Sequence, residues 1–369
     1  MKDWIKGMDL STLLEVEACG GRFSDGGVPG GAMEILRGYG MNLVRLRLWN
    51  DPYAEDGTPY GAGTNDLKRT MLLARRAKLL GVDWMLDFHY SDFWTDPGKQ
   101  TLPKAWRGMD ADALESAVYD YTLSVLRELK ESGLLPAMVA VGNEITNGLL
   151  WPLGRVPDYG SIARFVSAGI RAVRAVDPGI EVLVHLDNGG NNALYREWFD
   201  SYFANGGADF DCIGLSYYPF WHGGMDGLRE NMNDIARRYG RDLIVVETSM
   251  GFTLEDYAEY EALPANARKG MAARAELAAR IDYPMTPEGQ CAFLRDLAEV
   301  IRQVPEGRGR GFVYWEPAWL PVPGSGWANE AALAYTGEAG PGGNEWANQA
   351  LFDYEGRALP ALQTIREIG

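Results

Sequence analysis

The feature that most constrains the fold of this chain is an alternation of short apolar runs with longer amphipathic runs, repeated eight times. The short runs are too short for helices and predict buried strands near residues 6, 45, 86, 140, 183, 214, 245 and 313. The longer runs predict helices near residues 31–40, 67–80, 110–133, 161–176, 193–205, 227–239 and 286–304. Eight strand–helix units in one chain predict a closed (β/α)8 barrel rather than an open sheet.

The length of the chain agrees with this prediction, because α/β barrels often reach 369 residues as one domain. We therefore expect residues 1–369 to form a single α/β domain, a (β/α)8 TIM barrel. Long loops are predicted after strands 3, 7 and 8, at residues 90–109, 249–287 and 317–354. All three leave the carboxyl ends of strands, where barrel enzymes carry their active sites. The second loop contains an Ala/Arg-rich helical stretch at 266–281, to which the sequence assigns no role.

The charge of the chain excludes several classes of partner. A net charge of -16 argues against nucleic acid and anionic membranes, since both require clustered Lys and Arg. Cys19, Cys212 and Cys291 are odd in number and widely spaced, so we expect three packed thiols and neither a disulfide framework nor a zinc site. The first residues contain no apolar run of signal-peptide length, which favours a cytoplasmic location; secretion with the signal removed is the alternative. The sequence does not indicate an oligomeric state.

Two glutamates occupy equivalent places at the ends of predicted strands. Glu144 follows the apolar run at 139–141, and Glu247 ends the run at 243–246. A carboxylate at the end of a buried strand costs free energy unless something there uses it. We therefore predict that the two acids face one cleft.

Further polar residues gather at the predicted strand ends. They are Arg45, Arg47, Asp87, His89, Asn143, His185, Asp187, Ser216, Tyr217, Tyr218, Trp315 and Glu316. Any one of them is more often structural, but each buried polar group left unpaired costs about 1–3 kcal/mol, so the whole set indicates a functional site.

Glycoside hydrolysis is a reaction that such a set supports, because it requires two carboxyl groups with different pKa values. Arg45 beside Glu247 would keep that glutamate ionised. The resulting negative charge would raise the pKa of Glu144 and keep it protonated. Asn143, next to the acid, is suited to hydrogen-bond a sugar 2-hydroxyl.

Tryptophans in the predicted loops and strand ends favour a sugar substrate, since flat aromatic faces complement the apolar C–H faces of sugar rings. They are Trp94, Trp106, Trp151, Trp221, Trp315, Trp319 and Trp327. Other chemistries find little support. There is no His-x-His or His-Glu-x-x-His pattern, no Walker or dinucleotide-binding loop, and no Gly-x-Ser-x-Gly.

Several motifs resemble one family. They are WIKGMDLS at 4–11, VRLRLW at 44–49, DFHYSDFW at 87–94, GNEI at 142–145, SYYP at 216–219, VETS at 246–249, YWEPAW at 314–319 and NQALFD at 348–353. In this order they resemble the arabinogalactan endo-β-1,4-galactanases, glycoside hydrolase family 53. The resemblance extends from Gly7 to about Leu362.

The resemblance implies a retaining glycoside hydrolase that cleaves β-1,4-galactosidic bonds inside galactan or type I arabinogalactan and needs no cofactor. By motif, Glu144 is implied as the acid/base and Glu247 as the nucleophile. The side chains implied around the cleaved sugar are Arg45, His89, Asn143, Tyr217 or Tyr218, and Trp315, and those implied to contact neighbouring galactose units are Asp92, Trp94 and Trp319. Strand alternation alone does not decide which tyrosine points inward.

The sequence also bears on metal binding and on the identity of the substrate. Some bacterial relatives bind calcium after strand 7 through a dense Asp/His/Asn run, which residues 253–260 lack, so we expect no metal. The alternatives to a galactanase are another endo-β-1,4-glycanase of the same clan, acting on glucan, mannan or xylan, and a non-catalytic galactan-binding barrel. The presence of both Glu144 and Glu247 speaks against the second.

Overall fold

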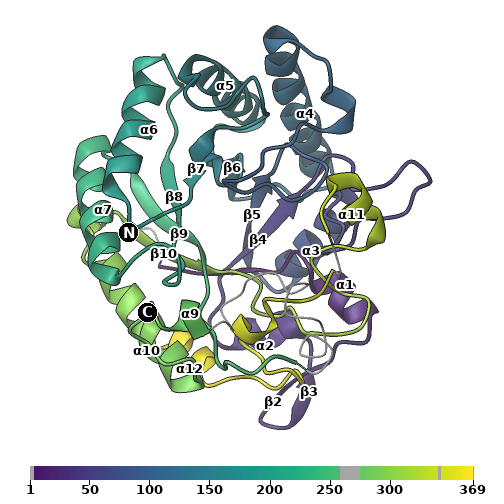
Figure 1. Ribbon diagram of the computed structural model, residues 1–369, viewed down its shortest axis with the longest axis vertical. Coiled ribbons are helices and arrows are strands. Elements are labelled where there is room, and N and C mark those ends of the chain that lie inside the picture. The colour runs from purple at the N-terminus through teal and green to yellow at the C-terminus, as the bar shows by residue number, and fades with distance from the viewer. Residues whose placement is uncertain (1–3, 258–274, 340–341, 369) are drawn as a thin grey trace.

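The computed structural model describes residues 4–257, 275–339 and 342–368, and its centre is a closed barrel of parallel strands (Figure 1). The barrel strands are β1 Ile5–Asp9, β4 Leu43–Leu48, β5 Asp83–Phe88, β6 Met138–Val141, β7 Glu181–Leu186, β8 Cys212–Ser216, β9 Asp242–Thr248 and β10 Gly309–Tyr314. Their order around the barrel is β1-β10-β9-β8-β7-β6-β5-β4. Each of the eight strands expected from the sequence is present, which confirms the (β/α)8 barrel.

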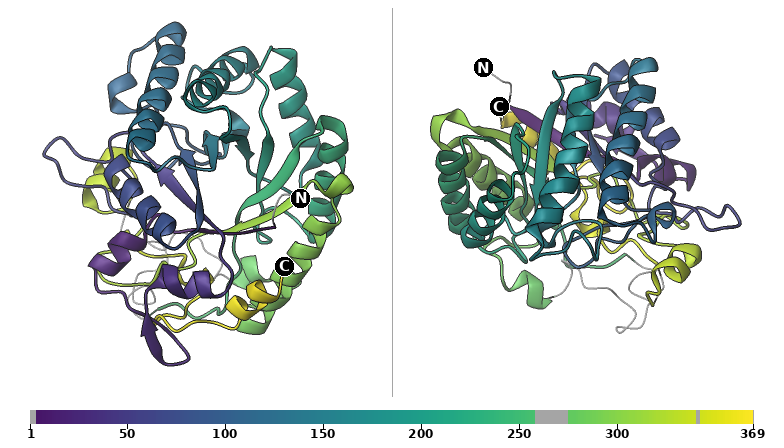
Figure 2. Two further views of the ribbon diagram at one scale, coloured as in Figure 1. Left: turned by 180° about the vertical axis from the view of Figure 1, so that it is seen from behind. Right: turned by 90° about the horizontal axis from the view of Figure 1, so that it is seen from above.

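Helices cover the outside of the barrel (Figure 2). The helices expected from the sequence are α2 Ala32–Gly38, α3 Leu67–Leu79, α4 Ala111–Glu131, α5 Tyr159–Val176, α6 Asn192–Ala204, α7 Met225–Tyr239 and α10 Pro287–Arg302. Several begin with a side chain that accepts a hydrogen bond from a backbone N–H three residues further on, as Asp110 does from Ala113. This cap stabilises the first turn of the helix. Within the described residues, no helix is long and apolar enough to span a membrane.

Short elements lie between the barrel units and were not expected from the sequence. They are α1 Leu13–Ala18, the hairpin β2 Phe23–Asp25 and β3 Val28–Gly30, α11 Glu330–Thr336, α12 Ala361–Glu367, and the 3-10 turns η1 Lys104–Trp106, η2 Ile145–Asn147, η4 Pro305–Gly307 and η5 Ala347–Gln349. Each of these elements has at most seven residues, which is too few to show a recognisable period of apolar residues. Of the helical stretch expected at 266–281, residues 266–274 lie outside the described part of the chain, and the short helix α9 Ala275–Ala278 lies in the remainder.

Alternation along the strands separates two hydrophobic cores. In β4, Val44 and Leu46 belong to the core between the strands and the helices, whereas Leu43 belongs to a second core inside the barrel. Period-two alternation places Arg45 and Arg47 on the same inner face as Leu43, nearer the carboxyl end of the strand. Inside the barrel, the apolar layer is therefore followed by a charged layer at the carboxyl ends of the strands, and this charged layer carries the site.

Replacement of a side chain in the inner core tests this layering. Leu183 of β7 is fully buried there, so Leu183→Ala should lower the free energy of unfolding by about 2–5 kcal/mol through lost burial and a residual cavity. Urea unfolding followed by circular dichroism measures the change. The matched control is Leu79→Ala at the end of α3, because Leu79 is 81% exposed and its truncation should change stability by less than about 0.5 kcal/mol. Equal effects of the two changes would contradict the assignment of Leu183 to the core.

Candidate active site

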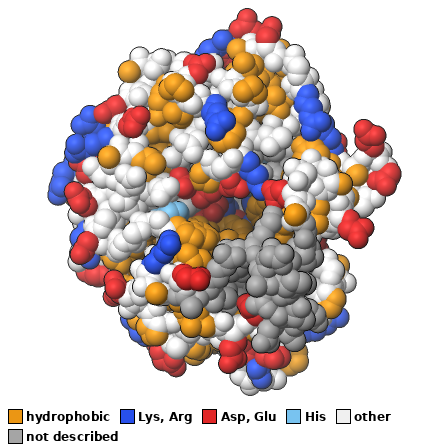
Figure 3. Space-filling view, viewed as in Figure 1, with side chains coloured by type: hydrophobic (Ala, Val, Ile, Leu, Met, Phe, Trp, Pro, Cys, Tyr) orange, Lys and Arg blue, Asp and Glu red, His pale blue; other side chains and the backbone are white. Residues whose placement is uncertain are grey.

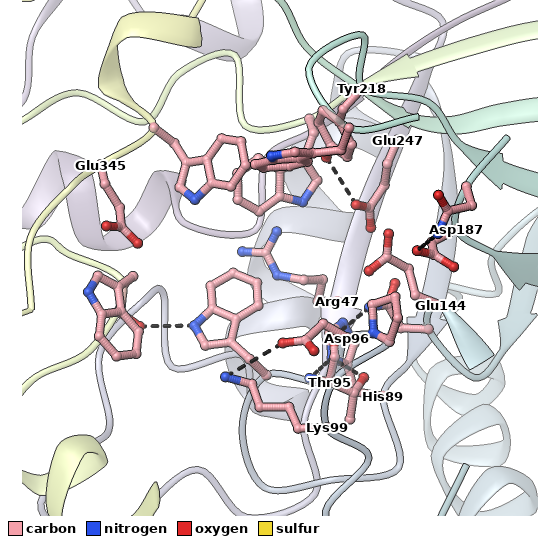
Figure 4. Close-up of a pocket in the computed structure, with 18 of the residues that line it drawn as sticks. Arg47, His89, Thr95, Asp96, Lys99, Glu144, Asp187, Tyr218, Glu247 and Glu345 are labelled. Atoms are coloured by element: carbon pink, nitrogen blue, oxygen red, sulfur yellow. Dashed lines mark hydrogen bonds and ion pairs between the residues drawn. The ribbon is translucent and has the colours of Figure 1, made fainter. Parts of the chain in front are cut away.

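A cavity of about 480 Å³ opens at the carboxyl ends of the strands. Figure 3 shows this face of the molecule hollowed near its centre, with acidic and apolar side chains together in the hollow. Both predicted acids, Glu144 and Glu247, contribute to its wall. In Figure 4 their side chains extend into the same space, Glu144 from the loop after β6 and Glu247 from β9. The prediction that the two glutamates meet in one cleft agrees with this placement.

The backbone around Glu144 is unusual. Gly142 directly follows β6 with a φ of 91°, and Glu144 itself has a φ of 47°, in the left-handed region. A non-glycine residue in this region is strained and persists where the surroundings over-determine it, a situation common at functional sites. A Cβ on Gly142 would lie 2.6 Å from Cγ2 of Ile145, so the turn that presents Glu144 requires glycine there.

Arg45 connects the second acid to the barrel. Its Nη2 lies 2.7 Å from Oε1 of Glu247 and 2.7 Å from Oδ2 of Asp87, and its Nη1 lies 2.8 Å from Oδ2 of Asp9. Nη2 also donates to Oδ1 of Asn143 at 2.8 Å. The guanidinium is fully buried. One cation thus joins residues that follow or belong to five strands, β1, β4, β5, β6 and β9, and the expected contact between Arg45 and Glu247 is present.

The surroundings of the two acids affect their pKa values differently. Burial raises the pKa of the Glu144 carboxyl well above its usual range, and the negative charges of Glu247 and Asp187 raise it further. Burial also raises the pKa of Glu247, but there the Arg45 cation opposes the change. Of the two carboxyl groups, Glu144 therefore binds a proton more readily than Glu247.

The neighbouring tyrosines answer the question that strand alternation left open. Tyr218 donates its hydroxyl hydrogen to Oε2 of Glu247 at 3.1 Å and lines the cavity. Tyr217 turns away: its hydroxyl donates to the carbonyl oxygen of Gly223, and its ring stacks on Phe293 of α10. The candidate sugar contact is Tyr218, and the proposal for Tyr217 is wrong.

His89 and Asn143 both line the cavity, as expected. Nδ1 of His89 accepts a hydrogen bond from the backbone N–H of Thr95, so the hydrogen of the neutral ring resides on Nε2, which lies 3.3 Å from Oδ2 of Asp87. Burial lowers the pKa of His89 and keeps it neutral. Asn143 uses one amide hydrogen on the carbonyl oxygen of Thr95, leaving the second for a ligand.

Tryptophans form much of the cavity wall. Trp94, Trp221, Trp315, Trp327 and Trp346 contribute to it. The Arg47 guanidinium lies 4.4 Å from the ring centre of Trp94 and 5.7 Å from that of Trp315, which orients both rings by cation–π attraction. Trp319 also borders the cavity but has no exposed surface, since it packs behind Trp94 and Trp315.

Three other sequence expectations are corrected by the structure. Asp92 is fully buried and does not line the cavity; its carboxylate accepts backbone hydrogen bonds from Asp51 and Lys104, so it organises loops rather than contacting a sugar. Trp106 is buried against Tyr121. Trp151 also lies off the cavity wall, with its indole N–H donating to a backbone carbonyl.

Several residues of the site were missed. Asp9 is the last residue of β1 and lies inside the motif at 4–11. Period-two alternation along β1 places its side chain inside the barrel, where it pairs with Arg45, and this alternation is the signal that could have identified it. Asp96, Lys99, Glu338, Glu345 and Trp346 line the cavity from the loops after β5 and β10. Irregular loops have no periodicity, so no signal in the sequence placed these residues at the cavity.

No metal ligands gather in the part of the chain that the structure describes, in the sense of three or more His, Cys, Asp or Glu side chains. Residues 258–260 of the loop considered for calcium lie outside that part. The expectation that the site works without a metal stays a prediction.

Comparisons with known proteins agree with this geometry. The model of the family described as Glycosyl hydrolase family 53 matches residues 5–365. An endo-β-1,4-galactanase of Bacillus subtilis is 35% identical over 99% of this chain and 86% of its own length. A solved GH53 catalytic domain of Ignisphaera aggregans superposes with a TM-score of 0.90 and 37% identity, covering 99% of this chain and 96% of that one. A solved structure of fungal β-1,4-galactanases superposes with a TM-score of 0.78 and 29% identity, covering 99% of each chain.

The role of Arg45 can be tested through stability. Arg45→Lys keeps one charge but replaces a planar fork by a point charge that cannot reach Asp9, Asp87 and Glu247 together. We expect the free energy of unfolding to fall by about 3 kcal/mol or more, because buried carboxylates lose their partner. Urea unfolding at neutral pH measures the loss. Arg171→Lys, which alters an exposed ion pair with Glu115, is the control and should leave the transition unchanged. Wild-type stability of Arg45→Lys would contradict the role of Arg45 as the common partner.

Proposed function

The chain belongs to glycosyl hydrolase family 53, and from this premise we propose that it hydrolyses internal β-1,4-galactosidic bonds of galactan or type I arabinogalactan with retention at the anomeric carbon. The substrate class follows the relatives, which include the endo-β-1,4-galactanase of Bacillus subtilis. The observation that carries the proposal is the pair of glutamates in one aromatic-walled cavity, of which one has its pKa raised further by neighbouring negative charges and the other has a buried cation that opposes the rise.

In the first step, a carboxylate oxygen of Glu247 attacks the anomeric carbon of the bound galactose unit. The bond from that carbon to the glycosidic oxygen breaks, and Glu144 donates its proton to the departing oxygen. The product is a galactosyl ester on Glu247. Arg45 and Tyr218 support this step, since their hydrogen bonds orient the attacking carboxylate.

In the second step, Glu144 is a carboxylate and removes a proton from water. The water oxygen attacks the anomeric carbon, the ester bond to Glu247 breaks, and both acids return to their starting protonation. Because each displacement inverts the anomeric carbon, two displacements retain its configuration. Asn143 is placed to hydrogen-bond the sugar 2-hydroxyl through its remaining amide hydrogen.

Product analysis on linear β-1,4-galactan tests the substrate and the mode of cleavage. We expect a series of galacto-oligosaccharides early in the reaction, as internal cleavage gives, and no comparable release from mannan, xylan or glucan. Binding of galactan without any product would support the non-catalytic alternative. Faster cleavage of another β-1,4-glycan would replace galactan as the substrate while leaving the chemistry in place.

Removal of the proposed nucleophile gives a sharper test. Glu247→Ala should lower turnover of galactan by at least about 10⁴-fold, because no galactosyl ester can form. Azide, which is small enough for the vacated space, should partly restore cleavage of activated aryl β-galactosides and give the α-galactosyl azide. NMR of the product identifies the anomer. The control is Glu288→Ala on α10, far along the chain from both acids, which should retain activity. Unchanged hydrolysis by Glu247→Ala would refute the assignment.

Removal of the proposed acid should have a different signature. Glu144→Ala should lower kcat/KM for galactan by about 10²–10⁴-fold, but should affect substrates with good leaving groups far less, because these need little protonation. Parallel assays with galactan and a dinitrophenyl β-galactoside measure the contrast. Equal losses on both substrates would contradict the acid role of Glu144.

The pH profile of kcat/KM follows from the two carboxyl groups. At low pH Glu247 is neutralised and cannot attack, and at high pH Glu144 loses the proton that it must donate. Because burial and the charge of Glu247 raise the pKa of Glu144, the basic limb should lie well above the range of an ordinary carboxyl group. Initial rates across pH give the profile, and Glu144→Ala should lose this limb on activated substrates. Persistence of the limb in that variant would assign it to another group.

A further inference from the structure

Three buried residues form a closed ring of hydrogen bonds behind the proposed acid. The backbone N–H of Glu144 donates to Nδ1 of His185 at 3.4 Å. Nε2 of His185 lies 2.8 Å from Oγ of Ser216, and Ser216 donates to Oε1 of Glu144 at 2.6 Å. His185 lies in β7 and Ser216 is the last residue of β8, and both side chains are fully buried. The ring therefore begins and ends on Glu144.

The backbone N–H of Glu144 determines where every hydrogen in this ring lies. A peptide N–H cannot become an acceptor, so Nδ1 of His185 must be the unprotonated nitrogen. Burial lowers the pKa of His185 well below its usual range, so the ring is neutral and its hydrogen resides on Nε2. Nε2 then donates to Oγ of Ser216, which directs the single hydroxyl hydrogen of Ser216 to Oε1 of Glu144.

We propose that His185 and Ser216 are positioning residues that select which oxygen of Glu144 carries the catalytic proton. Oε1 already accepts a hydrogen, and a proton on it would face the hydroxyl hydrogen of Ser216. Within the described residues, the Glu144 carboxyl makes its hydrogen bond through Oε1, and Glu144 lines the cavity, so Oε2 is the oxygen available to a ligand. The proton is thus kept on the oxygen that faces the glycosidic bond. This inference rests on the proposed function of Glu144.

The charges around Glu144 explain why such selection is needed. The acidic groups that raise its pKa come from three elements: Glu247 from β9, Asp187 after β7 and Asp96 after β5. They favour the protonated acid but do not distinguish its two oxygens. The Ser216 hydrogen bond acts in the opposite direction and lowers the pKa. His185 itself faces Arg45, Asp87 and His89, and remains neutral among them.

The tautomer of His185 is a test that does not depend on activity. The chain has three histidines, so a long-range ¹⁵N–¹H correlation spectrum of labelled protein contains few imidazole signals, and His185→Gln identifies the signal of His185. We expect the Nε2–H tautomer, unchanged across the pH range of activity. The Nδ1–H tautomer, or a protonated ring at neutral pH, would overturn the proposal whatever the enzyme hydrolyses.

Kinetics of Ser216→Ala test the consequence for the acid. Without the donor the pKa of Glu144 should rise, moving the basic limb of kcat/KM upward by about one pH unit. At the optimum, kcat/KM for a galacto-oligosaccharide should fall about tenfold, while that for a dinitrophenyl β-galactoside should fall less than about twofold. Ser167→Ala on α5, a buried serine whose hydroxyl accepts a hydrogen bond from the backbone N–H of Ala208 and does not line the cavity, is the control and should show neither change. An unmoved limb, or equal losses on both substrates, would overturn the proposal.

Two changes at His185 separate orientation from packing. His185→Gln retains an N–H donor with the reach of Nε2, whereas His185→Leu retains bulk but no donor. We expect the leucine variant to move the basic limb in the same direction as Ser216→Ala, and the glutamine variant to stay closer to wild type. Equal impairment of both variants with an unmoved limb would show that His185 acts through packing alone. Inactivity of the wild-type protein on galactan would instead refute the proposed function and leave the tautomer measurement intact.

Discussion

The burial of the Arg45 guanidinium is the constraint on which the rest of the site depends. A cation without access to water is stable only among anions with good geometry, and here Asp9, Asp87 and Glu247 supply them. Those anions come from three different strands, so the charged end of the barrel closes around one side chain. The same attraction that stabilises the interior opposes the rise in the pKa of Glu247 that burial causes and so favours its charged form. Stability and reactivity of this carboxylate therefore share one cause.

The pKa of Glu144, the second acid, is set by burial and neighbouring negative charges rather than by a cation. Among the residues that the structure describes, no cation pairs with Glu144; it lies on strained backbone, among negative charges, with the Ser216 hydroxyl as donor. Two glutamates with the same intrinsic chemistry thus acquire different proton affinities from what surrounds them. The difference arises from the neighbouring groups: Arg45 on β4 beside Glu247, and Ser216 on β8, Asp187 after β7 and Glu247 itself beside Glu144.

The sequence was sufficient for the parts of the molecule that periodicity or motif order encodes. The strands, the long helices and the inward direction of Arg45 follow from alternation, and the pair Glu144 and Glu247 follows from equivalent places at strand ends. It was insufficient where a side chain leaves the regular strand. Tyr217 and Tyr218 stand just beyond β8, where period two no longer applies, and Asp92 lies in a loop whose folded path buries it. Loop residues such as Trp346 reach the cavity only through the tertiary fold.

The two glutamates and the tryptophans of the cavity wall are held by different parts of the fold. The two glutamates are held by strands and by the groups packed within the barrel, whereas Trp94, Trp327 and Trp346 stand on long loops after β5 and β10. Sequence change in those loops alters the surface that a polysaccharide meets without moving the atoms that break its bonds. In such a protein the chemistry and the choice of glycan depend on different segments of the chain. Related proteins can therefore evolve new substrate preferences through their loops while the residues that cleave the bond stay unchanged.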